Sequence, residues 1–221
     1  RFILSLSKGR DFKPKFSMNT PKVFAIGFQK TGTSSLGKAL EILGYRVSGY
    51  SSFRDYASHP HLTYELLLNR AVELVEQYDA FQDTPWPVLY QELDQKYPGS
   101  KFILVVRNTD DWIRSVVKDF SHYPNAIHEL IYGVPFPEGH ESIWIERYEK
   151  HNNDVKNYFK NRPNDLLVMN LNNGETCWEN LAPFVGKDIP KAPWPHTNKS
   201  MNKKIRMFWS RNWQKIKNLF S

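Results

Sequence analysis

The segment from Lys22 to Leu36 places a short apolar run directly before a glycine-bounded loop and a helical pattern. It reads Lys-Val-Phe-Ala-Ile-Gly-Phe-Gln-Lys-Thr-Gly-Thr-Ser-Ser-Leu. The run Val23 to Ile26 is typical of a buried strand, and the loop from Gly27 to Gly32 carries one lysine. In such a layout, backbone N–H groups and the positive end of the helix dipole converge on an anion. The segment therefore predicts a phosphate site between a strand and a helix.

The position of the lysine distinguishes this loop from that of a nucleotide hydrolase. A Walker loop has Gly, four residues and then Gly-Lys-Ser/Thr. Here Gly27 and Gly32 have that separation, but Thr33 follows Gly32, and Lys30 stands inside the loop. Such a loop suits a phosphate but is poorly arranged for Mg²⁺ and a triphosphate. It resembles the 5′-phosphosulfate loop of sulfotransferases, which use 3′-phosphoadenosine 5′-phosphosulfate (PAPS) as donor.

A second motif runs from Lys101 to Ser115. Phe102 to Val106 is a continuous apolar run, as expected for a strand that is buried on both faces of a parallel sheet. A helical pattern follows, and Asp110 or Asp111 is expected to cap that helix. The alternative interpretation is an ordinary buried strand followed by a capped helix.

Arg107 ends this strand, and Ser115 follows it by eight residues. A guanidinium at a strand end and a hydroxyl on the next helix can hold one phosphate from two sides, and arginine donates two hydrogen bonds at once. In sulfotransferases this spacing marks the site of the donor's 3′-phosphate. The resemblance therefore implies donor contacts from Gly27, Gln29, Lys30, Thr31, Gly32, Thr33, Ser34, Ser35, Arg107 and Ser115.

The third element is Asp83-Thr84-Pro85, which follows a short strand-like piece. Ligands of open α/β sheets bind outside the carboxyl ends of the strands, so Asp83 is expected on the same rim as Lys30 and Arg107. A carboxylate there can act as general base on a hydroxyl or amine. A branch of the sulfotransferases has Asp-x-Pro at this place, and the chain resembles that branch. Alternatively, Asp83 caps the following helix.

The resemblance covers about Lys22 to Asn198 and implies a three-layer α/β fold of the P-loop type, with a central parallel sheet flanked by helices. Strands are predicted near residues 22–27, 79–82, 101–106 and 165–169. Helices are predicted at 34–43, 64–76, 88–96, 111–120 and 142–160. Two irregular stretches, 48–61 and 121–140, are expected to grip the acceptor, and the candidate walls are Phe53, Tyr56, Tyr123 and Phe136.

The chain divides into an N-terminal extension (1–21), a sulfotransferase domain (22–200) and a C-terminal basic amphipathic helix (201–221). That helix has three possible roles: packing on the domain, peripheral membrane contact or a dimer interface. No apolar run is long enough to span a bilayer. The single cysteine, Cys177, fits a reducing compartment and a cytoplasmic protein. An anchor upstream of Arg1 is the alternative.

The net charge of +7 fits an anionic donor as well as it fits nucleic acid. No nucleic-acid-binding signature is visible, so no nucleic-acid partner is expected. The seven histidines have no metal-ligand spacing, so no metal is expected. His151 can face the site or pack in the core. His196, Asn198 and Lys199 belong to a late segment that could close over the donor.

The resemblance implies a sulfotransferase that moves a sulfuryl group from PAPS to a hydroxyl or amine and releases adenosine 3′,5′-bisphosphate. Lys30 and Asp83 are the expected catalytic residues. The acceptor is expected to be a small molecule or carbohydrate, and its identity and the oligomeric state stay open. Two alternatives are a P-loop nucleotide-dependent kinase and a non-catalytic nucleotide-binding protein of the same fold.

Overall fold

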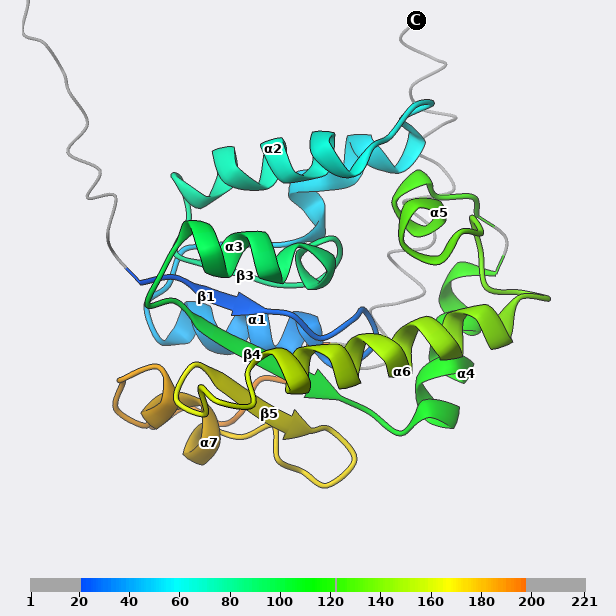
Figure 1. Ribbon diagram of the computed structural model, residues 1–221. Helices are drawn as coiled ribbons and strands as arrows, with labels where there is room; N and C mark the ends of the chain where they lie inside the picture. Colours follow the sequence, from blue (N-terminus) through cyan, green and yellow to red (C-terminus); the bar gives the residue numbers. More distant parts are fainter. Residues whose placement is uncertain (1–20, 122, 198–221) are drawn as a thin grey trace, which may run out of the picture.

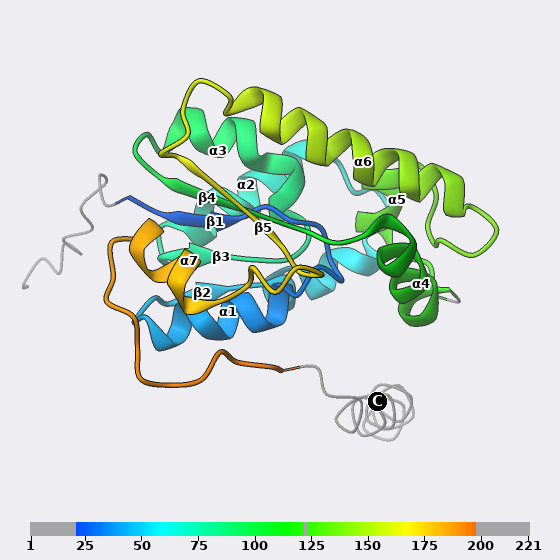
Figure 2. The same ribbon diagram turned by 90° about the horizontal axis from the view of Figure 1, so that it is seen from below.

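Five short strands form one parallel sheet in the order β2-β3-β1-β4-β5 (Figure 1 and Figure 2). The computed structural model describes residues 21–121 and 123–197. All neighbouring strands pair in parallel, so their carboxyl ends meet at one edge of the sheet. The predicted fold class, α/β with a central parallel sheet, is confirmed. The strands are β1 (Val23–Ala25), β2 (Val47–Ser48), β3 (Ala80–Phe81), β4 (Lys101–Val106) and β5 (Leu166–Asn170).

Helices cover both faces of the sheet. Figure 2 shows α3 and α6 on one side of the strands and α1 on the other. The α-helices are α1 (Thr33–Ile42), α2 (Tyr64–Val75), α3 (Tyr90–Lys96), α4 (Thr109–Phe120), α5 (Ala126–Tyr132), α6 (Glu141–Tyr158) and α7 (Trp178–Phe184). Two 3-10 helices, η1 (Tyr50–Ser58) and η2 (Trp86–Leu89), complete the described part.

Each face of the sheet has its own core because successive side chains of a strand point to opposite faces. Phe24 of β1 belongs to a cluster with buried residues of α2, α3 and α6. Its neighbours Val23 and Ala25 belong to a second cluster with Leu36 of α1 and Trp178 of α7. These two cores fix β1 between the layers, and with it the loop that leaves its carboxyl end.

The four predicted strands and five predicted helices are present, with ends shifted by a few residues. The sequence patterns missed β2, a two-residue strand at the edge of the sheet. They also missed η1 and α5, which lie within the two stretches predicted to be irregular, and α7. The predicted helix at 88–96 is α3 preceded by η2.

Several predictions concern residues outside the described part of the chain. They are the N-terminal extension, the C-terminal amphipathic helix, and the contributions of Asn198 and Lys199.

Candidate functional site

The loop between β1 and α1 has a backbone that favours glycine at two positions. A Cβ on Gly27 would lie 2.5 Å from the carbonyl oxygen of Val105, so no side chain fits there. Gly32 has a φ of 95°, in the left-handed region where glycine carries no steric cost. Lys30 adopts a φ of 70° in the same loop. The loop therefore passes close to β4 and then turns sharply into α1.

The N-terminus of α1 is free to receive an anion. Its N-cap residue, Gly32, provides no side-chain cap, and the first turn contains no acidic residue. The first N–H groups of a helix have no partner within it, and the helix dipole adds positive potential there. The hydroxyls of Thr33, Ser34 and Ser35 lie in this turn. The arrangement suits an anion such as phosphate, and phosphate binding here stays a prediction of the sequence.

A segment far along the chain returns to this helix end. The N–H of Thr197 donates to Oγ of Ser35 over 3.3 Å, and the two side-chain hydroxyls are also 3.3 Å apart. This contact brings Thr197, the neighbour of His196, beside the first turn of α1, and closure of this late segment over a donor stays a prediction.

Gln29 is buried and ties the loop to the surrounding elements. Its Nε2 donates to the hydroxyl of Tyr132 over 2.8 Å, and its Oε1 accepts from Oγ1 of Thr84 over 2.8 Å. Its carbonyl accepts from Nε1 of Trp112 over 2.9 Å. Within the loop, Oγ1 of Thr31 donates to the carbonyl of Phe28 over 2.7 Å. Gln29 and Thr31 are thus fixed inside the fold, where their side chains shape the loop.

Lys30 is held from two sides. Its Nζ forms an ion pair with Oδ2 of Asp119, and both side chains are largely shielded, with exposures of 21% and 12%. Its carbonyl accepts from Nη1 of Arg107 over 3.1 Å. Lys30 and Arg107 therefore meet at the carboxyl edge of the sheet, as predicted.

The backbone of Arg107 is anchored by Tyr148 of α6. The N–H of Arg107 donates to the hydroxyl of Tyr148 over 2.8 Å, and that hydroxyl donates to the carbonyl of Arg107 over 2.9 Å. The Tyr148 ring stacks on Trp112 at a centroid distance of 4.1 Å. A rigid aromatic pair thus fixes the end of β4.

The cap predicted for α4 is wrong. Asn108 caps this helix, because its Oδ1 accepts from the N–H groups of Asp110 and Asp111 over 3.0 and 3.3 Å. The helix starts at Thr109. Ser115 consequently lies nearly two turns into α4, not one, and it is half-buried. Helical periodicity places it between Trp112 and Asp119, on the face turned towards the loop.

Asp83 lies beside the first turn of α1. Its Oδ2 accepts from Oγ1 of Thr33 over 3.2 Å, and its Oδ1 accepts from the N–H of Thr84 over 2.8 Å. Asp83 has a positive φ of 72°. The alternative role as a helix cap is not seen, because η2 has no side-chain cap. The carboxylate is instead turned towards the loop.

Two tyrosines experience the charge of Asp83. Burial, assisted by this charge, raises the pKa of Tyr50 and of Tyr132. Tyr50 accepts from Nδ2 of Asn125 over 3.0 Å, and this contact joins η1 to α5. The two stretches predicted to grip the acceptor thus do meet near Asp83. Of the predicted walls, Phe53 is fully buried and packs in the core.

Two buried histidines are neutral at pH 7. Burial lowers the pKa of His128 and of His151 to about 4. Nε2 of His151 lies 2.8 Å from the carbonyl of Ile26, which assigns the proton to Nε2. His151 thus packs against the end of β1.

Sequence reasoning missed Asp119, Tyr148 and Asn108. Asp119 could have been found from the helical period Trp112, Ser115, Asp119, which places the three residues on one face. The partner of Tyr148 is distant in the chain, and no local pattern indicates it.

Within residues 21–121 and 123–197, no group of His, Cys, Asp and Glu side chains is arranged to hold a metal ion. No helix in this part combines the length and apolar character that crossing a bilayer requires.

Comparisons with known proteins place this geometry in context. The sulfotransferase domain family matches residues 22–134 and 119–203. A protein of Aspergillus versicolor, "Ava biosynthesis cluster protein M", is 24% identical over 239 residues, which cover 90% of this chain and 88% of that protein. A gluconokinase from Sinorhizobium meliloti 1021 covers 64% of this chain and 97% of its own, with a TM-score of 0.37 and 14% identity. That structural similarity is too low to bear on function.

Proposed function

The chain belongs to the sulfotransferase domain family, and on this premise we propose that it transfers a sulfuryl group from PAPS to a hydroxyl or amine of an acceptor. The observation that carries the proposal is the convergence of three motifs at one sheet edge. Thr33 of the loop contacts Asp83 over 3.2 Å, and Arg107 contacts the carbonyl of Lys30 over 3.1 Å. Segments that are distant in the sequence thus share one site.

In this proposal the loop and α1 hold the 5′ end of the donor. The first-turn N–H groups of α1 and the hydroxyls of Thr33, Ser34 and Ser35 bind the 5′-phosphate. Arg107 and Ser115 bind the 3′-phosphate, so the nucleotide is held at both ends. Fixing both ends orients the reacting bond and reduces the entropic part of the barrier.

The charged residues have separate roles in the transfer. The donor supplies the sulfuryl group and an anionic leaving group. The ammonium of Lys30 stabilises the negative charge that develops on the leaving side, an effect that is usually the largest single contribution. The carboxylate of Asp83 accepts the proton of the acceptor hydroxyl or amine. Hydrogen bonds from Oγ1 of Thr33 and from the N–H of Thr84 help to orient it for this task.

Calorimetry and a transfer assay test the proposal together. Adenosine 3′,5′-bisphosphate, titrated without Mg²⁺, should bind in the micromolar range, and Arg107→Ala should weaken this binding. Sulfur-labelled PAPS should then transfer its label to members of an acceptor panel. Preference for ATP with Mg²⁺ over the bisphosphate would replace the proposal with a kinase. Bisphosphate binding without any transfer would favour a non-catalytic protein.

A further inference from the structure

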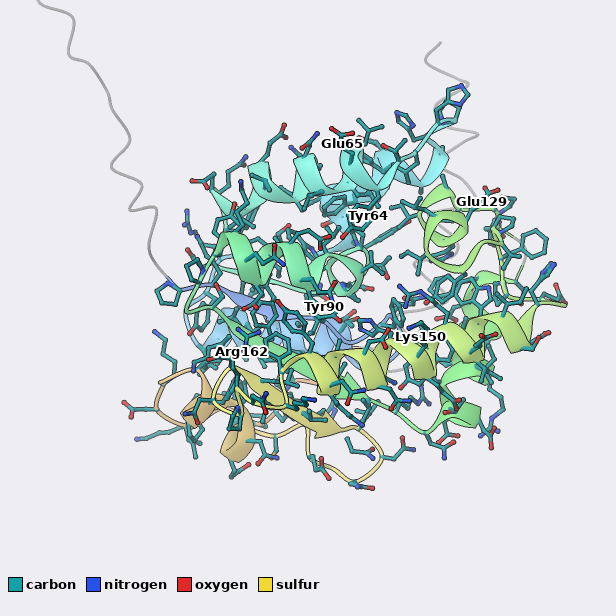
Figure 3. All side chains as sticks on the ribbon, in the orientation of Figure 1. Tyr64, Glu65, Tyr90, Glu129, Lys150 and Arg162 are labelled. Atoms are coloured by element: carbon teal, nitrogen blue, oxygen red, sulfur yellow. The ribbon has the colours of Figure 1, made fainter. Side chains whose placement is uncertain are left out.

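A pocket of about 470 Å³ opens between α3 and α6. One wall is formed by Val88, Tyr90 and Gln91, and the opposite wall includes Arg147, His151 and Asp154. Figure 3 shows Tyr90 between the two helices, where its ring meets that of His151 edge to face at 5.9 Å. This volume is in the range of small-molecule sites.

Arg147 provides the positive charge of the pocket. Its Nε donates to the carbonyl of Ile131 over 3.2 Å, and its guanidinium lies 5.6 Å from the ring centroid of Phe28. In the part of the chain that the structure describes, it forms no ion pair with a carboxylate. Arg147 is a half-buried residue, and the planar fork of its guanidinium suits a carboxylate.

The other charges leave this end of the pocket positive. Asp154 is paired with Lys150 over 2.8 Å, and both side chains are well exposed at the rim. His151 adds no charge at pH 7, because burial lowers its pKa to about 4. An anionic group entering the pocket therefore meets Arg147 without opposition from an unpaired carboxylate of its lining.

Arg147 connects the pocket to the loop that carries Lys30. Val88 and Tyr90 follow Asp83 along the chain through η2, and Phe28 beneath Arg147 belongs to the phosphosulfate-like loop. Arg147 holds the carbonyl of Ile131, and the neighbouring hydroxyl of Tyr132 accepts from Gln29 of the same loop. Oε1 of Gln29 also accepts from Oγ1 of Thr84, the neighbour of Asp83, so a series of contacts connects Arg147 to the residues beside the proposed general base.

We propose that the α3–α6 pocket binds the acceptor, that this acceptor is a small carboxylic acid bearing a hydroxyl or amine, and that Arg147 binds its carboxylate. The inference rests on the proposed sulfuryl transfer, whose acceptor class it specifies. Arg147 is then a residue that determines specificity, whereas Asp83 acts on the reacting group.

The test uses matched pairs of acids and neutral amides on the protein saturated with adenosine 3′,5′-bisphosphate. The probes are para-hydroxybenzoate, para-hydroxyphenylacetate and lactate, each beside its primary amide, and calorimetry measures binding. We expect at least one acid to bind about tenfold more tightly than its amide, as a charge-assisted bidentate contact would produce. Arg147→Met, which retains an apolar stem over Phe28, should abolish the preference, and Arg147→Lys should retain part of it.

Lys156→Met is the matched control, since it removes an exposed cation of the same helix that does not line the pocket and leaves the pairing of Asp154 with Lys150 intact. It should leave the preference for the acid intact. Thermal unfolding and bisphosphate binding of each variant show whether the fold persists. The inference would be overturned if the wild type bound acid and amide equally or bound neither. It would also be overturned if Arg147→Met still preferred the acid. Failure of bisphosphate binding would instead refute the proposed function.

Discussion

Oγ1 of Thr33 donates a hydrogen bond to Oδ2 of Asp83 over 3.2 Å, so the first residue of α1 contacts the second residue after β3. This contact joins the proposed donor site to the proposed general base. The carboxylate also accepts from the N–H of Thr84 over 2.8 Å. Asp83 is thus oriented by two elements, and its chemistry can be tested separately from donor binding.

Asp83→Asn should lower kcat by about 10²- to 10⁴-fold, because it removes a general base. The amide has nearly the same shape, so bisphosphate affinity should stay within about threefold of wild type. Steady-state kinetics and calorimetry measure the two effects. Asp110→Asn, at an exposed position, is the control and should change neither. An unchanged kcat in Asp83→Asn would remove the base assignment.

Lys30→Ala and Arg107→Ala should separate rate from affinity. Lys30→Ala should lower kcat by about 10²- to 10³-fold with a smaller change in donor affinity, because its ammonium acts on charge that develops during transfer. Arg107→Ala should weaken bisphosphate binding by about tenfold or more, because charge-assisted contacts to the phosphate are lost. Kinetics and calorimetry on both variants provide the comparison, and the reverse pattern would undo these roles.

Asp119→Asn should strengthen bisphosphate binding about fivefold. The Asp119 carboxylate forms an ion pair with Lys30 in a largely shielded setting, so it competes with an anion for the same ammonium. Its position near the end of α4, where the helix dipole is negative, adds to the local negative potential. Calorimetry in low salt measures the change. Weaker binding in the variant would show that Asp119 positions Lys30 for the donor.

The main features of the site could be predicted because each depends on local chemistry. A glycine-bounded loop after an apolar run indicates a phosphate loop, and Arg107 at the end of a second run falls on the same edge of any parallel sheet. The contacts between these motifs are long-range. The bond from Tyr148 to Arg107 and the ion pair from Asp119 to Lys30 depend on how α6 and α4 pack, and no local pattern encodes that packing.

Sequence patterns missed elements that are very short, and they assigned the wrong cap where several cap residues lie close together. Strand β2 has only two residues and owes its conformation to pairing with β3. Helix α5 follows the cap residue Asn125, whose side chain accepts from two N–H groups. The proline, glycine and histidine residues around it led to the prediction of an irregular segment. At α4, asparagine competed with two nearby aspartates for the cap, and all three are good cap residues.

Gly27→Ala should destabilise the protein by about 1–3 kcal/mol, because the added methyl would lie 2.5 Å from a backbone oxygen of β4 and neither strand can move freely. It should also weaken bisphosphate binding if the protein folds. Gly44→Ala is the control: nothing lies within 4 Å of its Cβ, and only the positive φ of 90° is penalised, at a cost of about 1 kcal/mol. Urea unfolding measures both changes, and a smaller loss of stability in Gly27→Ala than in Gly44→Ala would contradict the steric argument.

The free energy of unfolding should fall as the pH is lowered from about 6.5 to 4. His128 and His151 have a pKa of about 4 when folded, against 6.5 for exposed histidine, because burial disfavours the charged form. The unfolded chain therefore binds more protons in this interval, and each histidine should remove about 1.4 kcal/mol per pH unit. Above pH 6.5 both histidines are neutral in the folded and in the unfolded chain, so they no longer lower the free energy of unfolding. Urea unfolding across this interval measures the slope.

His128→Phe should reduce that slope by about half. Nδ1 of His128 is buried without a hydrogen-bond partner, and its ring already packs edge to face with Phe120 and Trp144, so phenylalanine can occupy the site. The variant should therefore gain stability relative to wild type at pH 5. His61→Ala, at an exposed position, should leave the slope unchanged. Arg46 holds the pKa of Asp79 below its usual 3.8. The ion pair of Arg46 with Asp79 should therefore lose its contribution to stability only below pH 4, outside the interval of the histidine effect. An unaltered slope in His128→Phe would assign the acid sensitivity to other groups.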